Sequence, residues 1–143
     1  MKAINPYLNF PGNTEEAFNF YKSVFGGELV GLTRFSDIPE DGKVKPNEKE
    51  KLMHVSLPIG KNNTLMATDV LESTGGQLIA GTNFHISLTA DSKEEATKIF
   101  NGLSKGGKVS MPLADTFWGD YFGMLTDKFG IQWMVNYTYP KDK

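Results

Sequence analysis

The stretch that decides the fold reads MPLADTFWGDYFGMLTDKFGIQWMV and runs from Met111 to Val135. Residues 131–137 are rich in β-branched and aromatic side chains, which favours a strand, and 121–126 is predicted to be the strand before it. Asp, Lys, Phe and Gly at 127–130 are suited to a turn, because glycine adopts positive φ without strain. The stretch therefore predicts a β-hairpin that closes a domain, with a loop carrying Phe117 and Trp118 before it.

Two short patterns occur twice at matching places in the chain. Glu-Glu-Ala occupies 15–17 and 94–96, and Gly-Gly occupies 26–27 and 106–107. Each Glu-Glu-Ala opens an apolar pattern of helical spacing after a residue able to cap a helix, and each Gly-Gly is suited to end that helix. The order strand, helix and three strands is therefore predicted twice, which indicates a repeated module.

The expected elements follow from hydrophobic periodicity and turn residues. The helix caps are predicted at Asn13 or Thr14 and at Asp91 or Ser92. The predicted strands are 2–10, 28–35, 52–59, 64–69, 83–89, a strand beginning at 108–111 and ended by Pro112, 121–126 and 131–137. The polar segment 37–51 is predicted to be a solvated loop, and a mobile flap over a site is the alternative.

The predicted fold class is α+β, with two βαβββ modules in a single domain of residues 1–143. Module one is expected at 1–69, a glycine-containing linker at 70–82 and module two at 83–139. Each module would have a helix on one face of its sheet. The other faces could then be brought together into one curved mixed sheet.

The composition indicates a compact chain and excludes several classes of protein. Of the 143 residues, 39% are hydrophobic, and a net charge of −2 with acidic and basic residues interspersed does not resemble a nucleic-acid-binding protein. The chain has no cysteine, so disulfides, thiolate metal ligands and cysteine nucleophiles are excluded. Neither a signal peptide nor an apolar run of about 18 residues is apparent. We therefore expect a cytoplasmic protein with no nucleic-acid or membrane partner.

Alternation along the predicted strands separates an apolar face from a mixed one. The apolar face, which includes Leu8, Phe84 and Trp133, is expected to pack against the helices. The mixed face carries uncharged polar groups with Met and Tyr, which suits a semi-enclosed pocket, and a subunit interface is the alternative. Its predicted pocket residues are Tyr7, Asn9, His54, Ser56, Met66, His85, Ser87, Gln132, Met134 and Asn136.

Several motifs resemble those of PhnB-like proteins in the vicinal oxygen chelate superfamily, which includes glyoxalase I, the bleomycin-resistance proteins and the extradiol dioxygenases. The closing stretch carries the resemblance from Pro112 to Met134 as P-L-x-D-T-F-W-G-x-x-F-G-M-L-x-D-x-F-G-I-Q-W-M. The opening stretch at 6–27 is similar as well, and so is Leu-Met-Ala at 65–67 with Asp69. The resemblance covers nearly the whole chain.

The resemblance implies the glyoxalase/bleomycin-resistance fold, in which paired modules enclose a cavity that is usually completed in a homodimer. In metal-dependent members, His and Glu on the first and last strands of each module hold a metal ion that chelates vicinal oxygens of the substrate. The matching positions fall near Pro6 or Tyr7 and at Met66, His85 and Met134. Only His85 is an expected ligand, and methionine thioethers suit Zn²⁺, Ni²⁺ or Mn²⁺ poorly. We therefore expect no metal and no other cofactor, and a Zn, Ni, Mn or Fe site with help from His54 is the alternative.

Two classes of function remain open. The first is a metal-free homodimer that binds a small aromatic or apolar ligand, which would stack on Phe117, Trp118 and Tyr121 and be oriented by His54, His85, Gln132 and Asn136. The second is a metal-dependent lyase, isomerase or dioxygenase with His85 as the catalytic ligand or general base. A dimer with no small-molecule role is a further alternative. Domains of this branch are often labelled demethylubiquinone methyltransferases, but the chain has no GxGxxG turn that would support the label.

Overall fold

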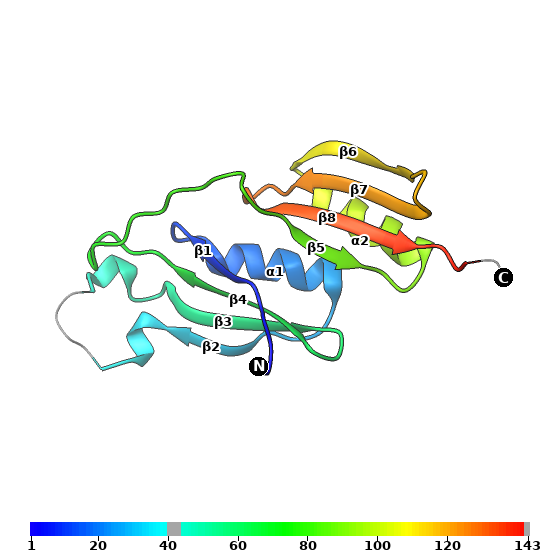
Figure 1. The fold of residues 1–143 in the computed structure, drawn as a ribbon. Helices are drawn as coiled ribbons and strands as arrows, with labels where there is room; N and C mark the ends of the chain where they lie inside the picture. The colour runs from blue at the N-terminus through cyan, green and yellow to red at the C-terminus, as the bar shows by residue number, and fades with distance from the viewer. Residues whose placement is uncertain (40–43, 142–143) are drawn as a thin grey trace. The chain divides into compact units, whose positions relative to one another are not determined.

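The computed structural model describes residues 1–39 and 44–141, which divide into two compact units, Met1–Ile79 and Ala80–Lys143. Unit 1 contains β1 (Tyr7–Phe10), α1 (Thr14–Phe25), β2 (Val30–Arg34), β3 (Leu52–Ile59) and β4 (Asn63–Asp69). Unit 2 contains β5 (Ile86–Thr89), α2 (Lys93–Ser104), β6 (Lys108–Asp115), β7 (Asp120–Thr126) and β8 (Gln132–Thr138) (Figure 1).

The strands pair within each unit into a four-stranded mixed sheet, and the two sheets have the same topology. The strand order is β1-β4-β3-β2 in unit 1 and β5-β8-β7-β6 in unit 2. In each sheet the first strand runs parallel to the last, and the remaining pairs are antiparallel. The predicted α+β class and the duplicated βαβββ order are therefore confirmed.

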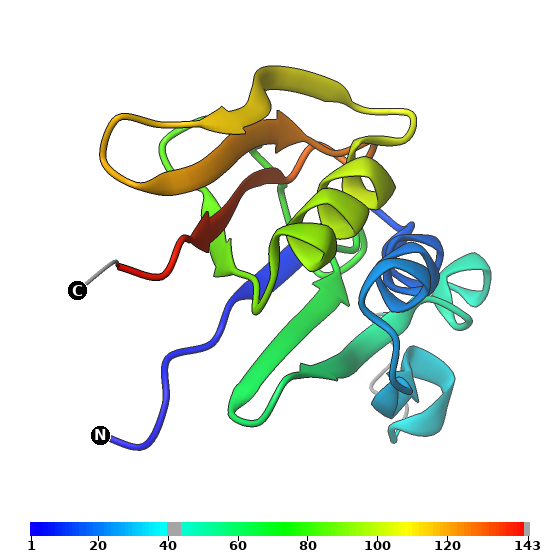
Figure 2. The same cartoon turned by 90° about the vertical axis from the view of Figure 1, so that its right-hand side faces the viewer.

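One helix packs against one face of each sheet. In unit 1, α1 lies on β3 and β4 and buries Ala17, Phe18 and Tyr21. In unit 2, α2 lies on β6, β7 and β8 and buries a similar apolar stripe (Figure 2). Alternate apolar side chains of the strands pack against these stripes, because successive residues of a strand point to opposite faces. The fully or almost fully buried strand residues include Leu8, Phe10, Val55, Leu57, Leu65, Ala67, Leu125, Trp133 and Val135.

The helix starts differ in how their backbone N–H groups are satisfied. At α2, the predicted cap Ser92 accepts a hydrogen bond from the Glu95 N–H at 3.0 Å. At α1, the side chain of Asn13 makes no capping bond. The carboxylate of Asp69, at the end of β4, instead accepts bonds from both the N–H (3.0 Å) and the hydroxyl (2.6 Å) of Thr14. A residue far along the chain therefore caps the first helix.

Two predicted strands are shorter than expected because side chains replace the backbone ladder. The strand predicted at 2–10 begins at Tyr7, since Pro6 has no N–H and the Asn5 side chain accepts the bond from the Thr64 N–H. The strand predicted at 83–89 begins at Ile86. Phe84, predicted to face the core, is 57% exposed.

The expectation that Pro112 ends a strand is wrong. β6 continues through Pro112 to Asp115. A proline is tolerated there because β6 is an edge strand and its register with β7 is irregular between Met111 and Ala114. The strand therefore extends one face of the sheet to the start of the aromatic loop.

The segment predicted as a solvated loop at 37–51 is partly ordered by local hydrogen bonds. Short 3-10 helices occupy Phe35–Asp37 and Pro46–Glu48. Residues 40–43 lie outside the described residues, and the flap alternative stays a prediction. In the described part of the chain, no helix is long and apolar enough to cross a membrane.

Candidate functional site

The face of the unit 1 sheet opposite α1, called here helix-free face 1, carries a row of side chains from all four strands. Tyr7 of β1, Met66 of β4, Ser56 of β3 and Val30 of β2 are successive Cα partners across the sheet. Tyr7 and Val30 are exposed, Met66 is half-buried and Ser56 is buried. Asn9, also predicted in the pocket, is exposed beside its partner Thr68 one step along the strands.

Three predicted pocket residues on this face form a hydrogen-bonded chain, named here the His54 relay. The Nδ1 atom of His54 lies 3.2 Å from the hydroxyl of Tyr7, and its Nε2 atom lies 2.9 Å from the hydroxyl of Ser56. The Tyr7 and His54 rings also contact each other, with centroids 5.8 Å apart. Both ring nitrogens of His54 are therefore engaged by hydroxyl groups, which fixes the orientation of the ring.

Gly31 lies against this imidazole, and its backbone conformation is one that favours glycine. It has φ +63°, and a Cβ atom there would lie 3.7 Å from the Cδ2 atom of His54. The irregular register of β2 around this glycine places Thr33 opposite His54 and Val30 opposite Ser56. Val30 was not among the predicted site residues, because the alternation of β2 is broken by this irregularity.

The corresponding face of unit 2, called here helix-free face 2, carries a row rich in methionine. Ser87 of β5, Met134 of β8, Met124 of β7 and Met111 of β6 are successive Cα partners. Met111 is 45% exposed, and Met124 and Met134 are half-buried. Met124 could have been found from its alternation with the buried Leu125, whereas Met111 was hidden by the expectation that Pro112 ends the strand.

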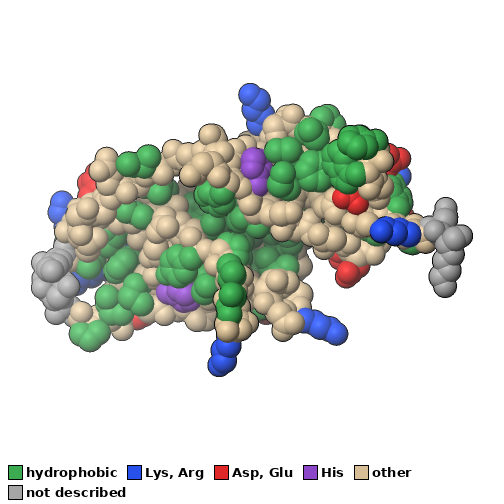
Figure 3. Space-filling view, in the orientation of Figure 1, with side chains coloured by type: hydrophobic (Ala, Val, Ile, Leu, Met, Phe, Trp, Pro, Cys, Tyr) green, Lys and Arg blue, Asp and Glu red, His purple; other side chains and the backbone are tan. Residues whose placement is uncertain are grey.

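Aromatic side chains extend the methionine row at one end. Phe122 shares helix-free face 2 because it is the Cα partner of Asn136, and the ring of Trp118 lies 6.2 Å from that of Phe122. The indole N–H donates to Asp120 at 2.9 Å, while Phe117 contacts Trp118 edge to face and is 97% exposed. In Figure 3, hydrophobic side chains gather over β6, β7 and β8. Trp118 therefore belongs to this surface, and Phe117 stands at its rim.

The remaining predicted residues of unit 2 are placed on or next to β5 and β8. His85 is half-buried and directly precedes β5. Gln132 donates from Nε2 to the carbonyl of Phe84 at 2.5 Å, and Asn136 donates from Nδ2 to the Thr138 hydroxyl at 3.2 Å. The side-chain amides of Gln132 and Asn136 therefore donate hydrogen bonds to groups within unit 2.

Tyr121 lies on the helix side of unit 2 and not on helix-free face 2. Its hydroxyl is 3.2 Å from the Thr97 hydroxyl of α2, and the ammonium of Lys93 lies 4.9 Å from its ring centroid. Nearby, Tyr139 donates a 2.5 Å hydrogen bond to Asp115, and this bond raises the pKa of Tyr139 above its ordinary value. The predicted stacking role of Tyr121 therefore finds no support in its position.

Known proteins identify the family of this chain. A family model described as the Glyoxalase/Bleomycin resistance protein/Dioxygenase superfamily matches residues 3–135. The chain belongs to this superfamily. Protein YjdN of Escherichia coli (strain K12) is 30% identical over 141 residues, which covers 93% of this chain and 93% of YjdN.

Solved structures from this glyoxalase/bleomycin-resistance superfamily show the same fold. Protein PA1353 from Pseudomonas aeruginosa is 44% identical with a TM-score of 0.82, covering 94% of this chain and 96% of PA1353. A protein from Bacillus cereus is described as a putative 3-demethylubiquinone-9 3-methyltransferase, PhnB protein. It is 27% identical with a TM-score of 0.75, and the match covers 94% of this chain and 98% of the Bacillus cereus chain. The predicted resemblance to PhnB-like proteins is thus confirmed.

The metal site of metal-dependent superfamily members can be tested against these residues. Tyr7 and Met66 are Cα partners in unit 1, but the Cα partner of Met134 in unit 2 is Ser87 and not His85. The donors at these paired positions are a phenol, a hydroxyl and two thioethers, whereas divalent transition metals prefer imidazole and carboxylate. Across the described ranges, no three His, Asp or Glu side chains are grouped so as to hold a metal ion. These side chains do not fit a divalent ion.

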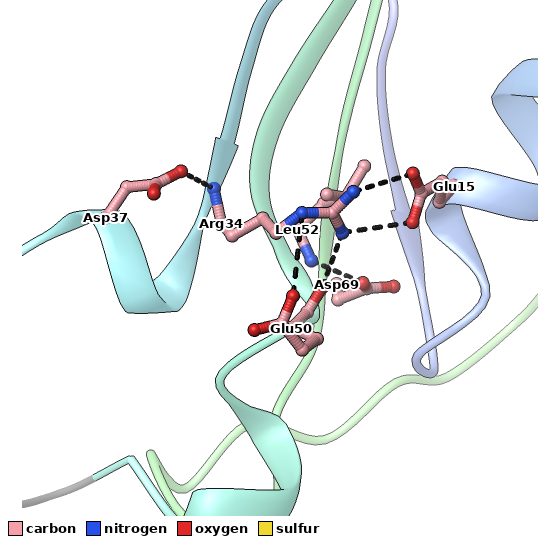
Figure 4. A network of polar contacts seen from close by, with 6 residues as sticks. All are labelled: Glu15, Arg34, Asp37, Glu50, Leu52 and Asp69. Atoms are coloured by element: carbon pink, nitrogen blue, oxygen red, sulfur yellow. Dashed lines mark hydrogen bonds and ion pairs between the residues drawn. The ribbon is translucent and has the colours of Figure 1, made fainter.

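An open hollow of about 410 Å³ in unit 1 lies apart from the predicted pocket residues. It is lined by Gly12, Glu15, Arg34, Asn47, Glu50, Lys51, Leu52 and Asp69. The Arg34 guanidinium donates two bonds to Glu15, at 3.0 and 2.8 Å, and one to the Glu50 carbonyl at 2.7 Å (Figure 4). The bond from Arg34 lowers the pKa of Glu15 below its usual value.

This network has a structural role that sequence reasoning missed. It joins the end of β2 to α1 and to the segment before β3, and Lys51 adds a bond to the Gly12 carbonyl at 2.9 Å. Arg34 thus pairs with Glu15 and Glu50, whereas Lys51 and Asp69 bind backbone groups and the Thr14 hydroxyl. The one available signal was that Arg34 is the only arginine in the chain.

Proposed function

We propose that the chain is a metal-free homodimer that binds a small, partly aromatic or apolar molecule on the helix-free faces of its sheets. The observation that carries this proposal is the composition of helix-free face 1. Strands β1–β4 contain only two charged residues, Arg34 and Asp69. Arg34 is bound to Glu15 of α1 and Asp69 to Thr14 of α1. The strands thus present uncharged polar groups and a methionine, which is typical of ligand pockets and not of a solvated sheet.

Helix-free face 2, taken by itself, offers apolar contacts to a ligand. Thioethers are polarisable and adapt to ligands of different shape, and they make favourable contacts with aromatic rings. Met111, Met124 and Met134 lie next to Phe122 and Trp118 in one continuous surface. A flat aromatic or apolar group therefore has a complementary surface there.

Each face also carries hydrogen-bonding groups that would orient a ligand bound on that face. The His54 relay offers two hydroxyl groups on helix-free face 1, and Ser87 offers an exposed hydroxyl beside Met134 on helix-free face 2. His85 is half-buried, and the described residues contain no cluster of metal ligands that it could join. Its role as the catalytic residue of an enzyme stays a prediction.

The proposed homodimer is supported by the exposed apolar side chains of the edge strands. Val109 (41%) and Met111 (45%) are exposed on β6, and Val30 (48%) is exposed on β2. Edge strands with such side chains are commonly covered by another chain. Light scattering of the tag-free protein would measure the mass, and a monomer at micromolar concentration would contradict the homodimer.

The ligand proposal is tested by elemental mass spectrometry and by thermal unfolding. Tag-free protein is analysed before and after incubation with Ni²⁺, Zn²⁺, Mn²⁺ and Fe²⁺, and its melting temperature is measured with each ion and with a set of small aromatic compounds. A ligand that binds only the native state raises the melting temperature. We expect stabilisation by aromatic compounds and not by metals. A stoichiometric metal ion that disappears in His85→Ala would instead favour the metal-dependent enzyme.

The methyltransferase activity in the description of the Bacillus cereus protein is not part of this proposal. The chain has no GxGxxG sequence, the glycine-rich turn that dinucleotide-like cofactors require after a strand. The superfamily fold that the two proteins share does not imply a shared reaction.

A further inference from the structure

The His54 relay joins two strands of unit 1 through three groups that can each donate and accept hydrogen bonds. Tyr7 comes from β1, and His54 and Ser56 come from β3. The distances of 3.2 Å to Nδ1 and 2.9 Å to Nε2 are both hydrogen bonds. Tyr7 is 46% exposed and Ser56 is 9% exposed, so the tyrosine end of the relay is open to a ligand.

The number of protons in the relay determines what it can offer to a ligand. With a neutral imidazole, the relay holds three N–H or O–H protons and uses two of them internally, so a single hydroxyl proton remains free. With a protonated imidazole, both ring nitrogens donate to the hydroxyl oxygens. The hydroxyl protons of Tyr7 and Ser56 are then both free, and the relay gains a positive charge.

No other charged group from the strands faces the relay. On β1 and β4 its neighbours are Asn9, Met66 and Thr68, and β2 contributes Gly31 and Thr33. The two charged residues of these strands are engaged on the helix side, where Arg34 binds Glu15 and Asp69 binds Thr14. A protonated His54 would therefore be unopposed by any carboxylate of these strands.

We infer that the His54 relay binds an anionic oxygen of the ligand, such as a carboxylate or a phenolate, together with a proton on the imidazole. This inference rests on the proposed small-molecule function and adds the chemical class of the ligand. The protonated relay provides a cation and frees the hydroxyl proton of Tyr7, and a hydrogen bond to an anionic acceptor is stronger than one to a neutral acceptor. The Tyr7 hydroxyl is the donor that the ligand contacts, and Ser56 completes the relay from behind.

Proton uptake makes the expected affinity depend on pH in one direction. A ligand that binds the protonated relay more tightly must bind more tightly at low pH, because binding and protonation are linked. An uncharged ligand of the same shape gains nothing from the extra proton. Comparison of the two ligands therefore separates the anion site from ordinary apolar binding.

The test uses benzoate and its uncharged analogue benzamide with the full-length protein. Binding is followed by NMR of the histidine and methionine side chains, since the chain has only two histidines and six methionines. Titrations are run at about pH 5.5 and about pH 8, on either side of the range in which a free imidazole titrates. The variants are His54→Gln and Tyr7→Phe, with Lys61→Gln as the control, because Lys61 is an exposed cation in the turn between β3 and β4 and belongs to no proposed site.

We expect benzoate to bind about tenfold more tightly at the lower pH, with this preference lost in His54→Gln and retained in Lys61→Gln. Tyr7→Phe should weaken benzoate and leave benzamide nearly unchanged. If benzoate and benzamide bind equally at both pH values, or if His54→Gln leaves the preference intact, the anion site is wrong while the small-molecule function stands. If neither compound perturbs the spectrum at either pH, both the anion site and the proposed function are contradicted. Far-UV circular dichroism of each variant verifies that it is folded.

Discussion

Replacing Asp69 by alanine should destabilise unit 1 more than any change on its surface. Asp69 is 4% exposed, and its carboxylate accepts hydrogen bonds from the Thr14 N–H, the Thr14 hydroxyl and the Leu52 N–H, at 3.0, 2.6 and 2.8 Å. Through these bonds one side chain at the end of β4 holds the start of α1 and the start of β3. Thr14 and Leu52 are both fully buried, so water cannot replace the lost acceptor.

The magnitude follows from the donors that Asp69→Ala leaves without an acceptor. Two buried backbone N–H groups lose their partner, and each such loss costs about 1–3 kcal/mol. The helix also loses its cap, which contributes about 1 kcal/mol. Because these terms overlap, we expect a loss of about 3–5 kcal/mol, a large share of the roughly 5–15 kcal/mol that stabilises a typical domain.

Urea unfolding followed by far-UV circular dichroism measures this loss directly. With a slope of about 2 kcal/mol per molar urea, the midpoint should fall by about 2 M. Asp37→Ala is the matched control, because Asp37 is exposed and accepts one bond, from the Arg34 N–H at 2.8 Å. Its midpoint should change little. A loss below about 1 kcal/mol for Asp69→Ala would show that the two N–H groups find other acceptors, and the argument from burial would be refuted.

Three further predictions concern other parts of the chain. Glu15→Gln should cost less than about 1 kcal/mol at neutral pH because its partner Arg34 is partly exposed. The bond from Arg34 lowers the pKa of Glu15, so this stabilisation is lost as the pH falls through the folded-state pKa. The urea midpoints of the variant and the wild type should therefore converge in acid. A difference in midpoint that stays constant with pH would argue against a stabilising ion pair. Gly123→Ala should cost more than about 2 kcal/mol in the same assay, because the new Cβ would lie 2.7 Å from Phe100 and 3.0 Å from the backbone of β6, and an unchanged midpoint would mean that the strands can separate. Trp118→Ala, at a side chain 55% exposed, should leave stability nearly unchanged and weaken an aromatic ligand about tenfold in a binding titration; unchanged affinity would remove Trp118 from the site.

Much of the fold could be predicted because it depends on local patterns. The alternation of Leu65 and Ala67 with Met66 is visible in the sequence, and burial follows it residue by residue. The duplicated Glu-Glu-Ala and Gly-Gly patterns mark helices of equal length in modules of equal topology. Ser92 caps its helix by a bond to a residue three positions away, so its role could also be inferred locally.

Most of the wrong predictions occur where a contact with a residue distant in the sequence overrides a local pattern. The first strand begins later than predicted because Asn5 accepts a bond from Thr64, and Pro112 continues a strand because its neighbour β7 pairs irregularly with it. The misplacement of Tyr121 has another cause, because alternation along β7 already puts it on the same face as the buried Leu125.

The sequence by itself determined the order of the elements, the repeat of the module and, where a strand is regular, the face on which its residues lie. These properties depend on the 3.6- and two-residue periods of the backbone, which act over a few neighbouring positions. Only the tertiary structure decided which polar groups meet. Tyr7 reaches His54 across 47 positions of sequence, and Thr14 reaches Asp69 across 55. Strand pairing sets these contacts, because a side chain finds its partner through the register of the whole sheet and not through its own neighbours.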